Sequence, residues 1–183
     1  MSTETLNQQI PAGTWTVDPV HSAVHFAITH NRVATFRSRF TGLEATLSGG
    51  EQPKLEGAVE VASIDVDEAQ LKGHLLSADF FDAEKYPQLK FASTELSVED
   101  DGTVRLAGEL AVKGGTRSIQ ASGRYGAIGA DLGGNERVGL SFETTLDRRD
   151  VDLGWNADLP SGGQVLEYDV TINVELELVQ QGA

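Results

Sequence analysis

The segment VTINVELELV, residues 170–179, alternates apolar and polar side chains along almost its whole length. Because successive side chains of a β-strand point to opposite faces, this pattern predicts a strand with one buried and one solvated face. The same alternation occurs in TVRLAGELAV, residues 103–112, and in GLSFETTL, residues 139–146. Further strands are predicted at residues 21–29, 38–47, 55–66, 89–98 and 118–125.

Glycine-rich segments such as SGGEQP, KGGT and DLGGN separate these strands and favour tight hairpin turns. About eight strands, each apolar on one face, must bury those faces together. A closed antiparallel barrel does so and leaves no long sheet edge, whereas a two-sheet sandwich is the alternative. The pattern therefore predicts an all-β fold of about eight antiparallel strands, and both the barrel and the sandwich stay open at this point.

The connection at residues 67–87 is too long for a bare loop in a compact domain, so we predict one or two short helices within it. In DEAQLKGHLL the leucines recur at helical spacing and favour a first helix. Ser77 is predicted to be the N-cap of a second helix, and Pro87 to end it.

Length and charge limit the domain organisation and the partners. The 183 residues suit one domain, which we place at residues 14–180, with residues 1–13 as a flexible N-terminal extension. The net charge of −14, without a basic stripe, argues against nucleic acid and against an anionic membrane surface as partners. A monomer and a homodimer both remain open.

The chain has no cysteine, which excludes disulfides, thiolate nucleophiles and cysteine-based metal sites. The opening MSTETLNQQIPAG resembles no secretory signal, and no apolar run reaches the ~20 residues of a transmembrane helix. We therefore expect a cytoplasmic protein without stable membrane insertion.

The histidines are the first candidates for chemistry. His21 and His25 would lie roughly 13 Å apart on a strand, too far to share a metal ion. We expect hydrogen-bonded histidines and no metal site. The motifs of a serine hydrolase or a phosphate-binding loop are absent from the sequence. The segment DRRD, residues 147–150, is interpreted as a solvated ion-pair patch, with a polar contact at a pocket mouth as the alternative.

The segment GHLLSADFFDAEKYPQLKF, residues 73–91, holds three of the seven phenylalanines. Phe80 and Phe81 could plug one barrel end, contributing roughly 2 to 3 kcal/mol each when buried. They could equally line a cavity, because an eight-stranded barrel either fills itself or holds one small ligand. Both interpretations use the same residues, and composition leaves both open.

Four segments in a fixed order resemble the YceI-like family from residue 14 to about residue 179. They are WTVDPVHSAVHFAITH, the segment 73–91, GELAVKGGTRSI, and the ending from Trp155 and Asn156 to VTINVEL. The resemblance implies an all-β, eight-stranded antiparallel, lipocalin-like barrel whose interior holds a long isoprenoid or related lipid, such as a polyprenyl chain or a quinone tail. It implies binding, storage or transport without catalysis.

Beside this reading stand a hydrolase or isomerase that uses a histidine with a nearby carboxylate, and a structural or partner-binding module. We expect no catalytic residue and no cofactor other than a bound polyprenyl or quinone-type lipid. The expected ligand-binding residues are Phe26, Ile28, Phe36, Phe40, Leu75, Leu76, Phe80, Phe81, Phe91, Phe142 and Trp155. The expected polar contacts are His21, His30, His74 and Arg149.

This chain departs from the family pattern at cationic positions. Leu71 and Lys72 stand where the family usually has Arg-Asp, and Leu76 replaces a common arginine. Val151 and Asp152 replace a common Phe-Gly. The lost cations weigh against an anionic head group and favour a more apolar ligand.

Overall fold

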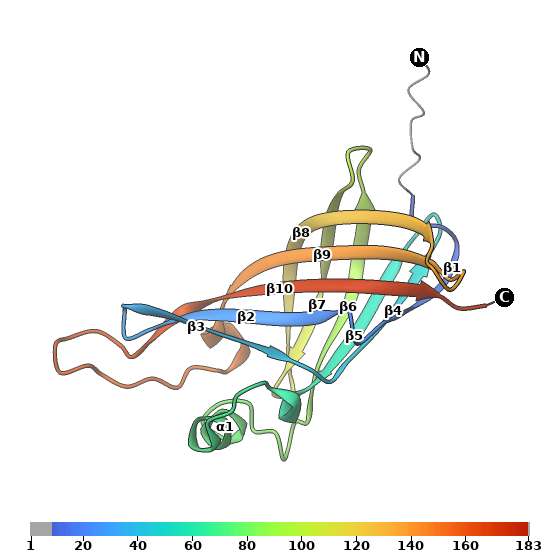
Figure 1. The fold of residues 1–183 in the computed structure, drawn as a ribbon. Helices are drawn as coiled ribbons and strands as arrows, with labels where there is room; N and C mark the ends of the chain where they lie inside the picture. Colours follow the sequence, from blue (N-terminus) through green and yellow to red (C-terminus); the bar gives the residue numbers. More distant parts are fainter. Residues whose placement is uncertain (1–8, 183) are drawn as a thin grey trace.

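The structure is a computed structural model that describes residues 9–182 (Figure 1). Ten strand segments form one antiparallel sheet. They are β1 (Gly13–Val17), β2 (Ala23–His30), β3 (Ala34–Phe40), β4 (Leu43–Gly49), β5 (Lys54–Glu60), β6 (Gln88–Val98), β7 (Thr103–Val112), β8 (Gly115–Ala130), β9 (Glu136–Asp147) and β10 (Leu166–Gln180). The described residues also contain one α-helix, α1 (Ala69–Leu76), and two 3₁₀ turns, η1 (Val61–Ser63) and η2 (Arg148–Val151).

The sheet closes into a barrel because β10 pairs with both β1 and β2. Val17 lies opposite Leu178, and further along β10 the strand β2 takes over as the neighbour. In the same way β3 pairs with β2, and β4 pairs with β1. β1 and β2 therefore act as one long, bent strand, and β3 and β4 act as another. With these two counted once each, the predicted eight-stranded antiparallel barrel is confirmed.

The strand predictions differ from the structure at the bent strands. The predicted strand at residues 38–47 is interrupted at Thr41 and Gly42, because their backbone pairs with the η1 region: Thr41 N donates to Ser63 O, and Glu60 N donates to Gly42 O. The predicted strand at residues 55–66 ends at Glu60, where η1 begins. Strand β1 was not predicted, because five residues carry too little alternation.

The connection between β5 and β6 contains one helix. The Glu68 carboxylate caps the N-terminus of α1 by accepting hydrogen bonds from the backbone N–H of Gln70 and Leu71. The prediction of Ser77 as an N-cap is wrong. Ser77 is the C-cap of α1, and both its backbone N–H and its hydroxyl donate to His74 O. After it the chain forms turns, with Asp82 in the left-handed region at φ 50°.

One end of the barrel interior is filled with large side chains. Trp15 is 2% exposed, and Leu47 and Leu178 are fully buried. The Trp15 Nε1–H donates to Pro11 O at 3.1 Å, and Ile10 is buried beside it. Of the extension expected at residues 1–13, residues 1–8 lie outside the described residues, whereas the part from Ile10 onward packs on the barrel. We refer to this region, which lies where β10 ends, as the packed end (Figure 1).

Within residues 9–182, no helix has the length and apolar character needed to cross a bilayer.

Candidate functional site

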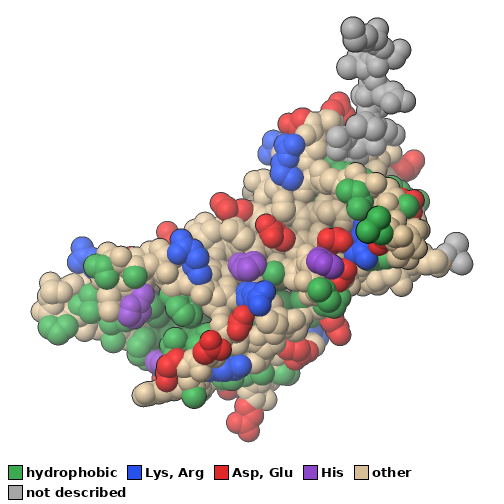
Figure 2. Space-filling view, in the orientation of Figure 1, with side chains coloured by type: hydrophobic (Ala, Val, Ile, Leu, Met, Phe, Trp, Pro, Cys, Tyr) green, Lys and Arg blue, Asp and Glu red, His purple; other side chains and the backbone are tan. Residues whose placement is uncertain are grey.

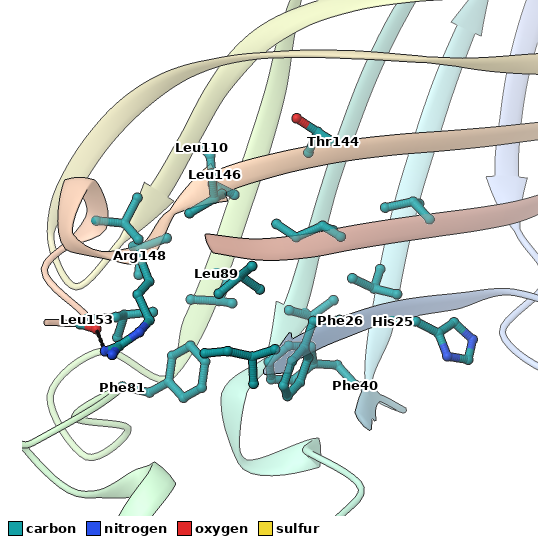
Figure 3. A pocket seen from close by; sticks show the side chains of 18 of the residues that line it. His25, Phe26, Phe40, Phe81, Leu89, Leu110, Thr144, Leu146, Arg148 and Leu153 are labelled. Atoms are coloured by element: carbon teal, nitrogen blue, oxygen red, sulfur yellow. Dashed lines mark hydrogen bonds between the residues drawn. The ribbon is translucent and has the colours of Figure 1, made fainter. Parts of the chain in front are cut away.

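A cavity of about 720 Å³ occupies the part of the barrel nearer to α1. Inward-facing side chains from every strand except β1 line it, together with α1, η2 and the segment from 153 to 166. Figure 3 shows that the walls consist mainly of aliphatic and aromatic side chains. The volume lies within the 300–1,000 Å³ typical of small-molecule sites.

The cavity exists because several inward positions carry small residues. Ala45, Gly57 and Ala121 belong to its lining on β4, β5 and β8. At the packed end, the corresponding inward positions carry residues such as Trp15 and Leu47. Since side chains fill an eight-stranded barrel only when they are large enough, this change in size leaves one part hollow.

Four phenylalanines form one wall of the cavity. The ring centroids of Phe26 and Phe40 lie 5.8 Å apart, and those of Phe26 and Phe36 lie 6.1 Å apart. Phe81 meets Phe40 edge to face at 5.9 Å. These separations and tilts are the ones that aromatic pairs prefer. Phe81 therefore fixes the chain after α1 against β3 while its own ring lines the cavity.

A second group, the His74–Phe80–Trp155 cluster, joins α1 to the segment after η2. The ring centroids of His74 and Trp155 lie 4.6 Å apart at 89°, and those of Phe80 and Trp155 lie 5.3 Å apart. His74 Nε2 also lies 3.2 Å from Asp79 Oδ2. All three rings belong to the cavity lining, so this cluster links two separate segments over the cavity.

Arg148 is the buried charge of the cavity wall, with 2% of the residue exposed. Its Nη1 donates to the carbonyl of Leu153, as Figure 3 shows, and to that of Trp155. Its Nε donates to Glu167 O. Burial lowers the pKa of Arg148, because the charged form loses its hydration. The guanidinium is committed to backbone carbonyls that hold the chain beside the cavity, and among residues 9–182 it forms no ion pair.

Sequence reasoning chose Arg149 and missed Arg148. Arg149 lies outside the lining, where it pairs with Asp147 and lies 3.9 Å over the Tyr168 ring. This pairing lowers the pKa of Asp147 to about 2. A 3₁₀ turn places every third side chain on one face, so Arg148 and Val151 are buried together. The sequence signal that could have identified Arg148 as buried is the apolar residue Val151 three positions later. The ion-pair interpretation of DRRD holds for Asp147, Arg149 and Asp150, but is wrong for Arg148.

The structure brings nearly all of the predicted apolar residues together. Leu76 lies outside the lining and packs, partly buried, against the core. The residues that line the cavity are Phe26, Ile28, Phe36, Phe40, Leu75, Phe80, Phe81, Phe91, Phe142 and Trp155. Their contact with a ligand stays a prediction. Alternation identified the further aliphatic lining residues as buried, but could not assign them to the hollow part: Leu43, Leu55, Val59, Leu89, Leu106, Leu110, Ile119, Leu146, Ile172 and Val174.

The predicted polar contacts are divided. His30 and His74 belong to the lining, whereas His21 does not. His25 also borders the cavity, but its ring points away from the other labelled side chains in Figure 3. Within the described part of the chain, Asp79 is the only side chain hydrogen-bonded to the His74 ring. Among residues 9–182, the cavity lining therefore does not assemble a nucleophile, a histidine and a carboxylate in one chain of hydrogen bonds.

His21 belongs to a charged cluster where β10 ends. His21 Nδ1 lies 2.9 Å from Asp18 Oδ2, and Arg137 Nη1 donates to both Asp18 and Glu177. Asp131 accepts from Arg137 Nε. Hydrogen bonds from His21 and Arg137 lower the pKa of Asp18 far below its ordinary value, and the bond to Asp18 raises the pKa of His21.

The possible ligand atoms of Asp18, His21 and Glu177 lie within 4.8 Å of one another, a spacing that a metal ion could use. The Arg137 guanidinium already places a positive charge between the two carboxylates. We therefore describe the cluster as an ion-pair network, and the expectation of no metal stays a prediction.

Comparison with known families gives a match over most of the chain. A family model described as a YceI-like domain matches residues 15–178. A UPF0312 protein of Vibrio parahaemolyticus is 27% identical over 159 residues, covering 85% of this chain and 81% of its own. A UPF0312 protein of Photorhabdus laumondii is 31% identical over 159 residues, covering 85% and 80%.

Solved structures share the fold at low sequence identity. BcnA of Burkholderia cenocepacia superimposes with a TM-score of 0.76 at 18% identity, over 88% of this chain and 98% of its own. A polyisoprenoid binding domain from Saccharophagus degradans gives a TM-score of 0.68 at 16% identity, over 91% and 98%. At these identities the similarity establishes the barrel architecture alone.

Proposed function

Because the chain belongs to the YceI-like family, we propose that it binds a long, apolar lipid of the isoprenoid type inside the barrel. The observation that carries this proposal is the 720 Å³ cavity with its predominantly apolar lining. Burial of apolar surface is the main driving force for such a ligand, and it needs few hydrogen bonds. The fold shared with a polyisoprenoid binding domain from Saccharophagus degradans supports the same ligand class.

The polar groups of the lining support an apolar ligand. Arg148 donates hydrogen bonds to backbone carbonyls, and His74 is paired with Asp79. Recognition of a phosphate by Arg148 Nε or Nη1 would break hydrogen bonds to backbone carbonyls, and recognition by His74 Nε2 would break the bond to Asp79. In this proposal the isoprenoid chain fills the cavity, and any polar head group stays on the side of α1, away from the packed end.

The direction of binding follows from the filled part of the barrel. Leu47 and Leu178 leave no room at the packed end, so the chain end of the ligand would stop against that layer. The bound lipid would be a polyprenyl or quinone-type molecule that the protein stores or transports without chemical change. A cytoplasmic location stays a prediction, which cell fractionation tests.

The direct test is native mass spectrometry, with lipid extraction, of the protein purified from its own host. We expect a bound apolar molecule that organic solvent releases unchanged. Protein that is empty as purified, and that binds neither a polyprenol nor a quinone in titration, would contradict the proposal.

A matched pair of variants on β8 tests the location of binding. Ala121→Phe adds a ring inside the cavity, whereas Ser122→Phe adds the same ring on the opposite face of the same strand. We expect Ala121→Phe to lower affinity for a polyprenol at least tenfold and Ser122→Phe to leave it unchanged. Fluorescence of Trp155 in a Trp15→Phe background reports binding, since the chain has two tryptophans. Equal affinities of the two variants would place the ligand elsewhere.

The hydrolase or isomerase alternative has weaker support. The His74–Asp79 pair supplies a histidine and a carboxylate, but His21 lies outside the cavity lining. Recovery of the unchanged ligand after long incubation would favour the binding role over hydrolase or isomerase activity.

A further inference from the structure

The charge of the chain is unevenly distributed. Residues 19–43 contain no aspartate or glutamate, although the whole chain has 28 acidic residues and a net charge of −14. The same stretch contains Arg32, Arg37 and Arg39. The expectation that the protein avoids anionic membranes rested on the net charge and the absence of a basic stripe, and did not consider this gap in the acidic residues. The fold instead gathers this acid-free stretch into β2, β3 and their connecting turn.

Two of these arginines are available to an external partner. Arg39 pairs with Asp65 at 3.0 Å. Arg32 and Arg37 are exposed, and within residues 9–182 neither forms an ion pair. The β2–β3 hairpin therefore carries unneutralised positive charge on a protein that is otherwise acidic.

The tip of the hairpin exposes an apolar residue beside a cation. Asn31 and Arg32 have left-handed φ values of 51° and 60°, which reverse the chain in a tight turn. Val33 follows with 86% of its surface exposed. Asn31 N donates to Val165 O, so the tip is fastened to the segment before β10. Figure 1 shows this hairpin projecting beyond the body of the barrel.

The hairpin is continuous with the cavity. Ile28 and Phe36 on its inner face belong to the cavity lining, as does Ala34 near the tip. Among the described strands β3 pairs only with β2, so the outer edge of β3 beside these residues has no strand neighbour. Hydrophobic side chains gather at this end of the molecule in Figure 2. Apolar side chains therefore lie at the tip, on the inner face of the hairpin and in the cavity.

We propose that the β2–β3 hairpin docks on a lipid bilayer that contains anionic phospholipids, and that the cavity exchanges its lipid there. The second part rests on the proposed function. Lipid phosphates would pair with Arg32 and Arg37, while Val33 enters the interface. Each arginine near an anionic surface contributes about fivefold in affinity. The acidic remainder of the chain is repelled, which orients the hairpin toward the bilayer and keeps binding transient.

The test is flotation of the full-length, ligand-free protein with two kinds of vesicle. One contains phosphatidylcholine alone, and the other an equal mixture of phosphatidylcholine and phosphatidylglycerol. We expect binding to the mixed vesicles only, with affinity falling as salt increases. The Arg32→Gln/Arg37→Gln double variant should bind about 25-fold more weakly, and Val33→Asp should lose binding.

Matched controls come from exposed residues that belong neither to the cavity lining nor to the β2–β3 hairpin. Arg124→Gln removes a cation on β8, and Leu132→Asp places an acid in the β8–β9 turn, where Leu132 is fully exposed. Both should bind mixed vesicles like the unaltered protein. Equal binding to neutral vesicles, no binding, or equal losses in the control variants would overturn the proposal. A difference in sedimentation between the unaltered protein and the Arg32→Gln/Arg37→Gln variant, measured without vesicles, would also overturn the proposal. It would indicate that the hairpin is a protein–protein interface.

The two proposals can fail separately. Vesicle binding uses no isoprenoid, so it can occur even if the cavity never takes up a polyprenol. Conversely, polyprenol binding that is sensitive to Ala121→Phe but occurs without any vesicle binding would overturn docking and leave the proposed function intact.

Discussion

Arg148 and Arg149 are neighbours in the sequence, yet their guanidinium groups lie in opposite environments. Arg148 is buried among backbone carbonyls, whereas Arg149 is exposed beside Asp147. The 3₁₀ turn decides this, because it places Arg148 on the same inner face as Val151. At the scale of single residues, the position of an arginine in this turn therefore decides whether its side chain is buried or exposed.

We predict that Arg148→Met destabilises the protein by about 2–4 kcal/mol, because carbonyls of the η2–β10 segment lose their donors while buried. Urea unfolding measures the change. Arg149→Met, which removes an exposed ion pair, should change stability by about 0.5 kcal/mol or less. Equal effects of the two variants would show that the hydrogen bonds from Arg148 to backbone carbonyls do not stabilise the fold.

The pKa of His21 should lie above its ordinary value of about 6.5, because Asp18 accepts a hydrogen bond from the charged ring. A raised folded-state pKa stabilises the fold below pH 6.5, and that contribution is lost as pH rises through the folded value. NMR titration of the His21 ring measures the pKa. Asp18→Asn should lower the pKa of His21 to the ordinary value or below. An unchanged pKa would show that the hydrogen bond with Asp18 does not cause the shift.

At the scale of elements, α1 is attached to the barrel by few contacts. None of its residues is fully buried, and its fixed points are its half-buried leucines and the His74–Phe80–Trp155 cluster. A short helix with little buried surface opens more easily than the strands beneath it. The aromatic cluster therefore controls how firmly the helix covers the cavity.

Trp155→Ala should make local opening of α1 easier by about 1–3 kcal/mol, because two aromatic pairs are lost. Hydrogen exchange measures this as faster exchange of the α1 amides, and stopped-flow measurements should show faster ligand release. The amides of β7 serve as the internal control and should exchange at unchanged rates. Acceleration across the whole barrel would mean that Trp155 supports global stability instead.

At the scale of the whole molecule, the barrel divides its interior between stability and binding. The packed end holds Trp15, Leu47 and Leu178, while the part near α1 is hollow. Large buried side chains supply the stability that a hollow barrel lacks. This division lets one small domain keep an open cavity without unfolding.

Trp15→Ala should therefore lower the free energy of unfolding by about 3–5 kcal/mol and leave polyprenol affinity nearly unchanged at low temperature. Urea unfolding and a ligand titration on the same sample separate the two effects. Trp155→Ala should show the reverse pattern, with a small loss of stability and faster release. A large loss of affinity in folded Trp15→Ala protein would contradict the division.

Alternation in the sequence predicted most of the strands, because it depends only on the two faces of a strand. The family resemblance carried by the ordered segments of the sequence added the closed barrel and the aromatic residues of the candidate site. The sequence could not predict β1 or the break between β3 and β4, where a short strand and a backbone contact from η1 set the geometry.

Tertiary structure alone decided that Arg148 faces inward, that His21 and His74 belong to separate clusters, and that the acid-free stretch forms one projecting hairpin. Sequence alternation tells which side chains point into a barrel. Only the pairing register of the strands decides which inward side chains meet, and so where the interior is filled and where it is hollow.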